Sequence, residues 1–83
     1  MKREDVVRIY NLAKERYVHA FQAGAEKDSF EMREAIATAE ACVSAIDDGS
    51  TMDEAAQLAL LSYGYAFSAH NLAVRGRIGG GRN

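Results

Sequence analysis

The segment at residues 58–74, LALLSYGYAFSAHNLAV, most constrains how this chain can fold. As a helix it is apolar or aromatic on nearly every side, so it needs neighbours on more than one side. A chain of 83 residues forms one domain and has little polypeptide with which to cover such a helix. The segment is also short and interrupted by polar residues, which argues against a membrane span; these residues are Ser62, Ser68, His70 and Asn71.

Two further helices are predicted over residues 4–25 and 29–47, where apolar side chains recur at alternating steps of three and four. The chain contains no proline, and Asp28 or Ser29 can cap the second helix. The predicted apolar stripe of the first helix consists of Val6, Tyr10, Ala13, Tyr17, Ala20 and Gly24. The predicted stripe of the second helix consists of Met32, Ile36, Ala39, Val43 and Ile46.

The third helix is predicted to begin at Met52 and to end at Val74 or Arg75. Gly49 suits the left-handed end of the second helix, and TMDE at residues 51–54 is a capping box that starts the third. One apolar side of this helix holds Leu58, Leu61, Tyr65 and Leu72. The other side holds Met52, Leu60, Tyr63, Phe67 and Val74. We expect the first two helices to cover one side and a second copy of the chain to cover the other.

The fold class that follows is all-α: a compact three-helix bundle over residues 1–75, in which the second and third helices form an antiparallel hairpin. Residues 76–83, GRIGGGRN, are predicted to form a flexible tail. The chain has one cysteine, Cys42, which rules out an internal disulfide, and its two histidines lack zinc-ligand spacing. Oligomerisation remains as a means of stabilising so small a domain, so we expect a homodimer or a higher assembly.

No catalytic motif is present, because the sequence contains no G-x-S-x-G, no P-loop and no dinucleotide fingerprint after a strand. A formal net charge of −2 is too small to indicate a nucleic-acid-binding surface. The beginning of the sequence, MKREDVV, lacks the apolar core of a secretory signal, so a cytoplasmic location is expected. We therefore expect a protein that is not an enzyme and needs no cofactor or metal.

Candidate contact residues lie mainly on the third helix, because aromatic side chains with polar tips suit interfaces and ligand walls. The residues predicted to contact a partner or ligand are Tyr63, Phe67, His70, Asn71, Arg75 and Arg77. The residues predicted to form the interface are Tyr10, Tyr17, Phe21, Leu60, Tyr63, Phe67 and Val74. His70 suits a general base or a ligand contact, or alternatively a hydrogen bond to a tyrosine hydroxyl or a carbonyl. Cys42 is expected to be a buried, inert thiol.

The segment at residues 51–78, TMDEAAQLALLSYGYAFSAHNLAVRGRI, suggests an alternative function through its resemblance to a known motif. The residues that carry it are Thr51, Glu54, Ala55, Ala56, Leu58, Ser62 and the basic end RGRI. The segment resembles the DNA-binding helix-turn-helix of excisionases and MerR-type proteins over about a third of the chain. The resemblance implies a DNA-binding transcriptional regulator. The segment departs from that family at Leu60, where the family has its turn glycine, and its supposed recognition helix contains no lysine or arginine before Arg75.

The function predicted first is that of a small helical binding protein, an oligomeric interaction or inhibitor module that acts on a macromolecular partner. Small helical proteins without catalytic motifs are common among phage and mobile-element accessory factors. The expected partners are a second copy and another protein, with nucleic acid as the lesser alternative and no membrane. A third possibility is a small anionic ligand held between subunits, with Arg8, Lys14, Arg16 or Arg75 at the mouth of the pocket.

Overall fold

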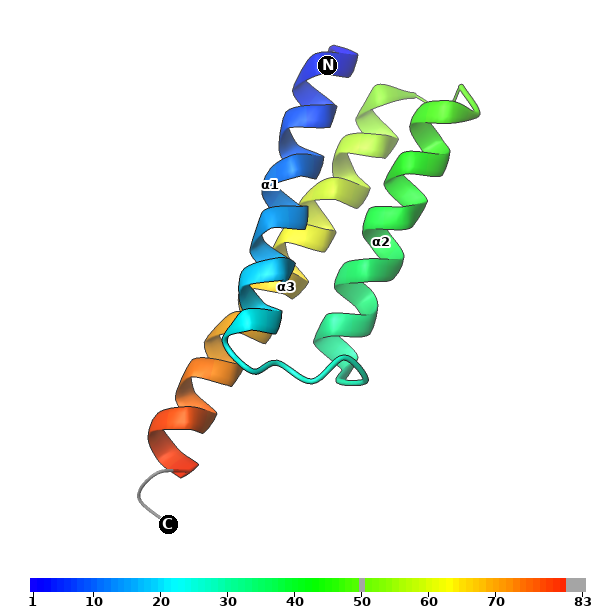
Figure 1. The fold of residues 1–83 in the computed structure, drawn as a ribbon. Helices are drawn as coiled ribbons and strands as arrows, with labels where there is room; N and C mark the ends of the chain where they lie inside the picture. The colour runs from blue at the N-terminus through cyan, green and yellow to red at the C-terminus, as the bar shows by residue number, and fades with distance from the viewer. Residues whose placement is uncertain (50, 81–83) are drawn as a thin grey trace.

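Three α-helices build the fold in a computed structural model that describes residues 1–49 and 51–80 (Figure 1). Helix α1 spans Arg3–Gln22, α2 spans Phe30–Asp47 and α3 spans Met52–Gly80. Successive helices run in opposite directions, α3 lies against both α1 and α2, and its C-terminal end extends beyond them (Figure 1). The all-α, three-helix class predicted from the sequence is confirmed, and the described residues contain no strand.

The starts of α2 and α3 and the end of α2 follow from local chemistry. The Oγ of Ser29 accepts a hydrogen bond from the backbone N–H of Met32 at 3.3 Å, which caps the start of α2. The Oγ1 of Thr51 accepts one from the backbone N–H of Glu54 at 3.2 Å, at the start of α3. Gly49, which follows the C-cap residue Asp48 at the end of α2, has a φ of +85°, a conformation that glycine adopts without strain. The helix boundaries predicted at these positions are confirmed.

Helix α3 is longer than predicted. It does not end at Val74 or Arg75 but continues to Gly80. Glycine lowers helix stability without forbidding a helix, so Gly76 does not end it. The turn that the helix-turn-helix resemblance places at Leu60 is absent, since Leu60 lies inside this uninterrupted helix. Residues 81–83 of the predicted tail lie outside the described residues.

Alanine supplies most of the buried side chains in the described part of the chain. Small side chains allow the backbones of neighbouring helices to approach closely. The buried apolar residues are Val6, Ala13, Ala20, Ala23, Met32, Ala35, Ala39, Cys42, Ala45, Ala55, Ala56, Ala59, Ala66 and Ala69. Ser62 is also buried, and its Oγ donates a hydrogen bond to the carbonyl oxygen of Ala35 at 2.6 Å. This bond satisfies the hydroxyl and joins α3 to α2.

The buried side of α3 differs from the prediction. We call it the inner face; it consists of Ala55, Ala59, Ser62, Ala66 and Ala69, at alternating steps of four and three. Two tyrosines border this stripe. Tyr65 lies beside α2, where its ring meets the ring of Phe30 edge-on at 5.8 Å between centroids. Tyr63 lies beside α1, under the guanidinium of Arg16. Each of the two predicted apolar sides therefore reaches a neighbouring helix through a tyrosine, whereas Leu61 of the first side and Leu60 of the second are exposed.

The buried side of α2 is also rotated relative to the prediction. Val43, expected in the apolar stripe, is 38% exposed. The buried positions instead pass through Ala35, Ala39 and Cys42, because α3 approaches α2 on that side. In α1 the predicted stripe is confirmed from Val6 to Ala20, where Val6 and two alanines at steps of seven are buried. Gly24 was wrongly included, because α1 ends at Gln22 and Gly24 is exposed with a φ of +106°.

Candidate functional site

The side of α3 opposite its inner face carries exposed leucines. Leu60 is 56% exposed and Leu61 is 51% exposed. Gly64 lies next to them, and nothing lies within 4 Å of the position that a Cβ atom would take there. Shallow hollows occur along this line, one beside Gln57 and one reaching Ser68. Leucine and an open glycine on one helix surface provide apolar area together with a site of close approach.

We call this surface the outer face. At about 100° per residue, its members fall within an arc of about 120° on the helix. All of them are exposed: Asp53, Gln57, Leu60, Leu61, Gly64, Phe67, Ser68, Asn71 and Arg75. The outer face therefore combines apolar side chains at its middle with polar or charged side chains at both ends.

A second feature lies where α1 meets α3. The guanidinium carbon of Arg16 lies 5.7 Å from the ring centroid of Tyr63 and 5.4 Å from that of Phe67. The two rings stack on each other at 6.3 Å between centroids. Such an arrangement of a cation over aromatic faces is attractive. The cluster therefore stabilises the packing of α1 against α3.

The same arginine holds His70. Nη1 of Arg16 donates a hydrogen bond to Nδ1 of His70 at 3.2 Å. Because arginine is only a donor, Nδ1 acts as the acceptor and carries no proton in this arrangement. The sequence predicted that Tyr63, Phe67 and His70 share a site, and the structure places them together. It did not predict Arg16 as the partner of His70, which was expected to be a tyrosine hydroxyl or a carbonyl.

The remaining predicted contact residues lie apart from this cluster. Tyr10 and Tyr17 pack inward against the buried residues, whereas Phe21 and Val74 are exposed. The predicted residues Asn71 and Arg75 are both exposed on the outer face, and the side chain of Arg77 lies outside the described residues. The assignment of these residues to an interface stays a prediction.

Two side chains, those of Cys42 and Tyr17, have pKa values raised by burial. Burial raises the pKa of the Cys42 thiol, which is inaccessible to solvent. Because the thiolate is the reactive form, this environment suits the inert thiol predicted from the sequence. Burial, followed by the charges of Tyr10 and Glu40, raises the pKa of the Tyr17 hydroxyl.

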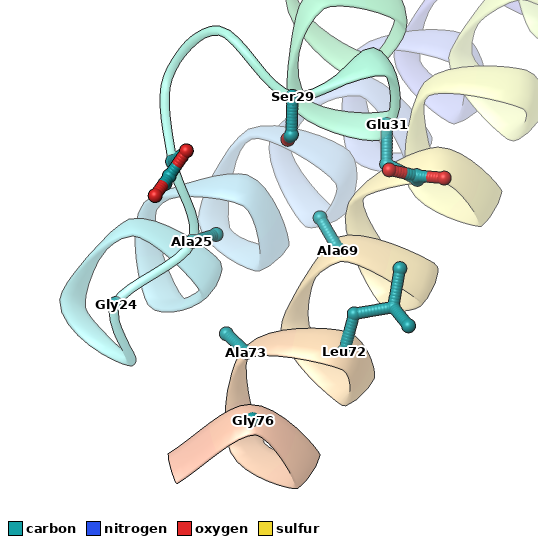
Figure 2. Close-up of a pocket in the computed structure, with 9 residues that line it drawn as sticks. Gly24, Ala25, Ser29, Glu31, Ala69, Leu72, Ala73 and Gly76 are labelled. Atoms are coloured by element: carbon teal, nitrogen blue, oxygen red, sulfur yellow. The ribbon is translucent and has the colours of Figure 1, made fainter. Parts of the chain in front are cut away.

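A hollow of about 380 Å³ lies between the α1–α2 connection and the C-terminal half of α3. In Figure 2, Ala69, Leu72 and Ala73 of α3 line one side, and the connection at Gly24 and Ala25 lines the other. Its ionisable lining residues are Glu26 and Glu31. Two carboxylates repel an anion, so this hollow does not suit the anionic ligand considered from the sequence.

No match to a protein-family model, to a curated protein or to a solved structure is found for this chain. Over residues 1–49 and 51–80, no helix has both the length and the hydropathy needed to cross a membrane. In the same part of the chain, no group of three or more histidine, cysteine, aspartate or glutamate residues is placed to hold a metal ion. The function is therefore inferred from the surfaces of the fold.

Proposed function

We propose that this chain is a non-enzymatic binding module that holds another folded polypeptide against the outer face of α3. The observation that carries the proposal is the distribution of side-chain size on α3. Alanine fills its inner face, whereas Leu60 and Leu61 are more than half exposed on its outer face. Apolar side chains gathered on one surface, with polar residues around them, are typical of protein interfaces.

The side chains best suited to chemistry have other roles, which supports binding without turnover. The thiol of Cys42 is buried and its pKa is raised, so it is a poor nucleophile. The Nδ1 atom of His70 already accepts a hydrogen bond from Arg16. We infer that the protein acts stoichiometrically, as an oligomeric interaction or inhibitor module.

Nucleic acid is a less suitable occupant of the outer face. Phosphate groups are bound by several lysine or arginine side chains, and affinity depends on their number. Among its exposed residues the outer face offers Arg75 and, at the opposite end, the carboxylate of Asp53. A folded polypeptide, which meets leucine with apolar side chains of its own, fits this composition better.

Two leucines with equal exposure allow a matched test. Leu61 lies on the outer face and Leu12 lies on α1, and each is 51% exposed. We would express tagged wild-type, Leu61→Lys and Leu12→Lys chains in the cell of origin and measure the mass of the purified species by native mass spectrometry. We expect a complex larger than one 9.1 kDa chain with the wild type and Leu12→Lys, and its loss with Leu61→Lys.

Circular dichroism would confirm that both lysine variants keep the helical content of the wild type. A wild-type chain that is recovered only as a single 9.1 kDa species would contradict the proposal. Equal loss of the complex in both variants would show that the outer face has no special role.

A further inference from the structure

The outer face of α3 has a symmetric order of side chains about its midpoint, Gly64. Moving away from Gly64 in either direction, the face presents first an uncharged residue, then an amide and then a charge, and the two charges are opposite. The pairs, at four, seven and eleven residues from Gly64, are Leu60 with Ser68, Gln57 with Asn71, and Asp53 with Arg75. Steps of four, seven and eleven residues return to nearly the same side of a helix, so these residues form one line along α3.

We propose that this line binds the same line of a second copy in antiparallel orientation, with a two-fold axis at Gly64. The inference rests on the proposed function and names the polypeptide that occupies the outer face. Around this axis, Asp53 of one copy faces Arg75 of the other, and each such pair occurs twice. A closed dimer requires a surface that is complementary to itself in this way.

The charges also set the direction of the pairing. In a parallel pair of α3 helices, Asp53 would face Asp53 and Arg75 would face Arg75, so like charges would meet at both ends. The antiparallel pair replaces both repulsions by attractions. Both charged side chains are available, because the side chain of Asp53 is 82% exposed and Arg75 is exposed. The contact of Asp53 with the N-terminal amine, at 3.5 Å, is an exposed one that adds little stability.

The shape of the outer face agrees with the same axis. Open space at Gly64 lets two helix backbones approach each other at the axis. Leu61 and Phe67, three residues before and after Gly64, then meet across it, and each Leu60 lies over the small Ser68 of the other copy. The line from Asp53 to Arg75 is roughly 33 Å long at about 1.5 Å per residue, so the contact extends over most of α3.

A charge exchange tests the arrangement in the purified full chain. Light scattering after size-exclusion chromatography, over a dilution series, gives the mass and the dissociation constant. We expect wild-type chains to form a dimer of twice 9.1 kDa. Asp53→Arg and Arg75→Asp should each raise the dissociation constant by about fivefold to tenfold, and the double variant should return it to near the wild-type value.

Recovery in the double variant distinguishes charge pairing from damage to the fold. If each single change only disturbed the fold, the two changes together would raise the dissociation constant further and would not restore it. Glu54→Arg is the matched control for Asp53→Arg. Glu54 lies in the same first turn of α3 and is also exposed, but at about 100° per residue it falls outside the arc of the outer face. We expect this control to leave the dissociation constant unchanged.

Cysteine cross-linking tests the position of the axis. Gly64→Cys places two thiols at the axis, so oxidation should link the copies, whereas Ser68→Cys faces Leu60 of the other copy and should not link. A dimer that is cross-linked by Ser68→Cys in place of Gly64→Cys, or that the charge exchange does not restore, would overturn this arrangement. A purified chain that stays monomeric would also overturn it. The proposed function would then stand only if the larger complex from cells were still lost in Leu61→Lys.

Discussion

The inner and outer faces of α3 reverse the usual distribution of side-chain size. Ala55, Ala59 and Ala66 are buried on the inner face, whereas Leu60 and Leu61 are exposed on the outer face. Small buried side chains give close backbone contact but remove little apolar area from water, so the hydrophobic gain on folding is modest. The larger apolar side chains of the outer face stay exposed. Under the proposed function, a partner that binds them would stabilise the folded chain further.

The largest expected effect on stability comes from placing a large side chain on the inner face, and it is compared with placing a small one on the outer face. Ala59 is fully buried, so Ala59→Leu inserts three carbon atoms where two helices approach closely. We expect the free energy of unfolding, measured by urea titration, to fall by about 2–3 kcal/mol. The neighbouring change Leu60→Ala, on the outer face, should alter it by less than about 0.5 kcal/mol in dilute protein. Similar effects at the two positions would mean that the faces do not differ in packing.

A smaller effect is expected from the buried hydroxyl of the inner face. Ser62→Ala removes the hydrogen bond to the carbonyl oxygen of Ala35 and should lower the free energy of unfolding by about 1 kcal/mol. The loss stays modest because that carbonyl lies inside α2 and keeps its place in the backbone hydrogen bonding of the helix. The hydroxyl of Thr38 also lies 3.2 Å from it, although its shorter hydrogen bond, at 2.6 Å, goes to the carbonyl oxygen of Glu34. Ser44→Ala, at an exposed position of α2, is the control and should change urea stability little. An equal change in the two variants would show that the bond contributes nothing.

The smallest effect on stability is expected from alkaline pH, which acts on side chains in the interior of the bundle and not on the outer face. Burial raises the pKa of Cys42 above 9.0 and that of Tyr17 above 10.0, so the unfolded chain loses these protons first as the pH rises. Their contribution to stability is complete below pH 9 and is lost as the pH rises through the folded-state values. The thermal midpoint should therefore fall on going from below pH 9 to above pH 10.

The variant Cys42→Ala separates the two groups. It should remove the part of the decline that begins near pH 9 and keep the part that begins near pH 10. Because the substitution also removes a buried atom, the slopes with pH are compared and not the absolute midpoints. An unchanged slope between pH 9 and pH 10 would contradict a buried, protonated thiol.

The sequence predicted those parts of the fold that depend on local chemistry. The hydroxyl groups of Ser29 and Thr51 cap the helices that follow them, and Gly49 adopts a positive φ that glycine tolerates without strain. These helix boundaries can therefore be predicted from a few neighbouring residues. The end of α3 was missed because a glycine such as Gly76 lowers helix propensity only modestly.

The rotation of each helix about its axis depends on distant segments and was predicted less well. Large apolar residues dominate a hydrophobic pattern, so Val43 was assigned to the buried side that alanine in fact occupies. In the candidate site, Tyr63, Phe67 and His70 share one side of a helix by their spacing alone. Arg16 reaches them from α1. From the sequence, Arg16 was only one of four cations that could lie at the mouth of a pocket, because a contact between two helices depends on how they pack.

The hydrogen bond from Ser62 to Ala35 has a consequence for the uniqueness of the fold. Helix faces made of alanine are nearly smooth, so two of them could slide past each other by one turn, about 5.4 Å, with little change in contact area. After such a slide the hydroxyl of Ser62 would lie away from the carbonyl of Ala35, buried and without this acceptor. The bond therefore favours the observed alignment of α2 along α3, together with the edge-on contact of Phe30 with Tyr65 and the short connection between the two helices.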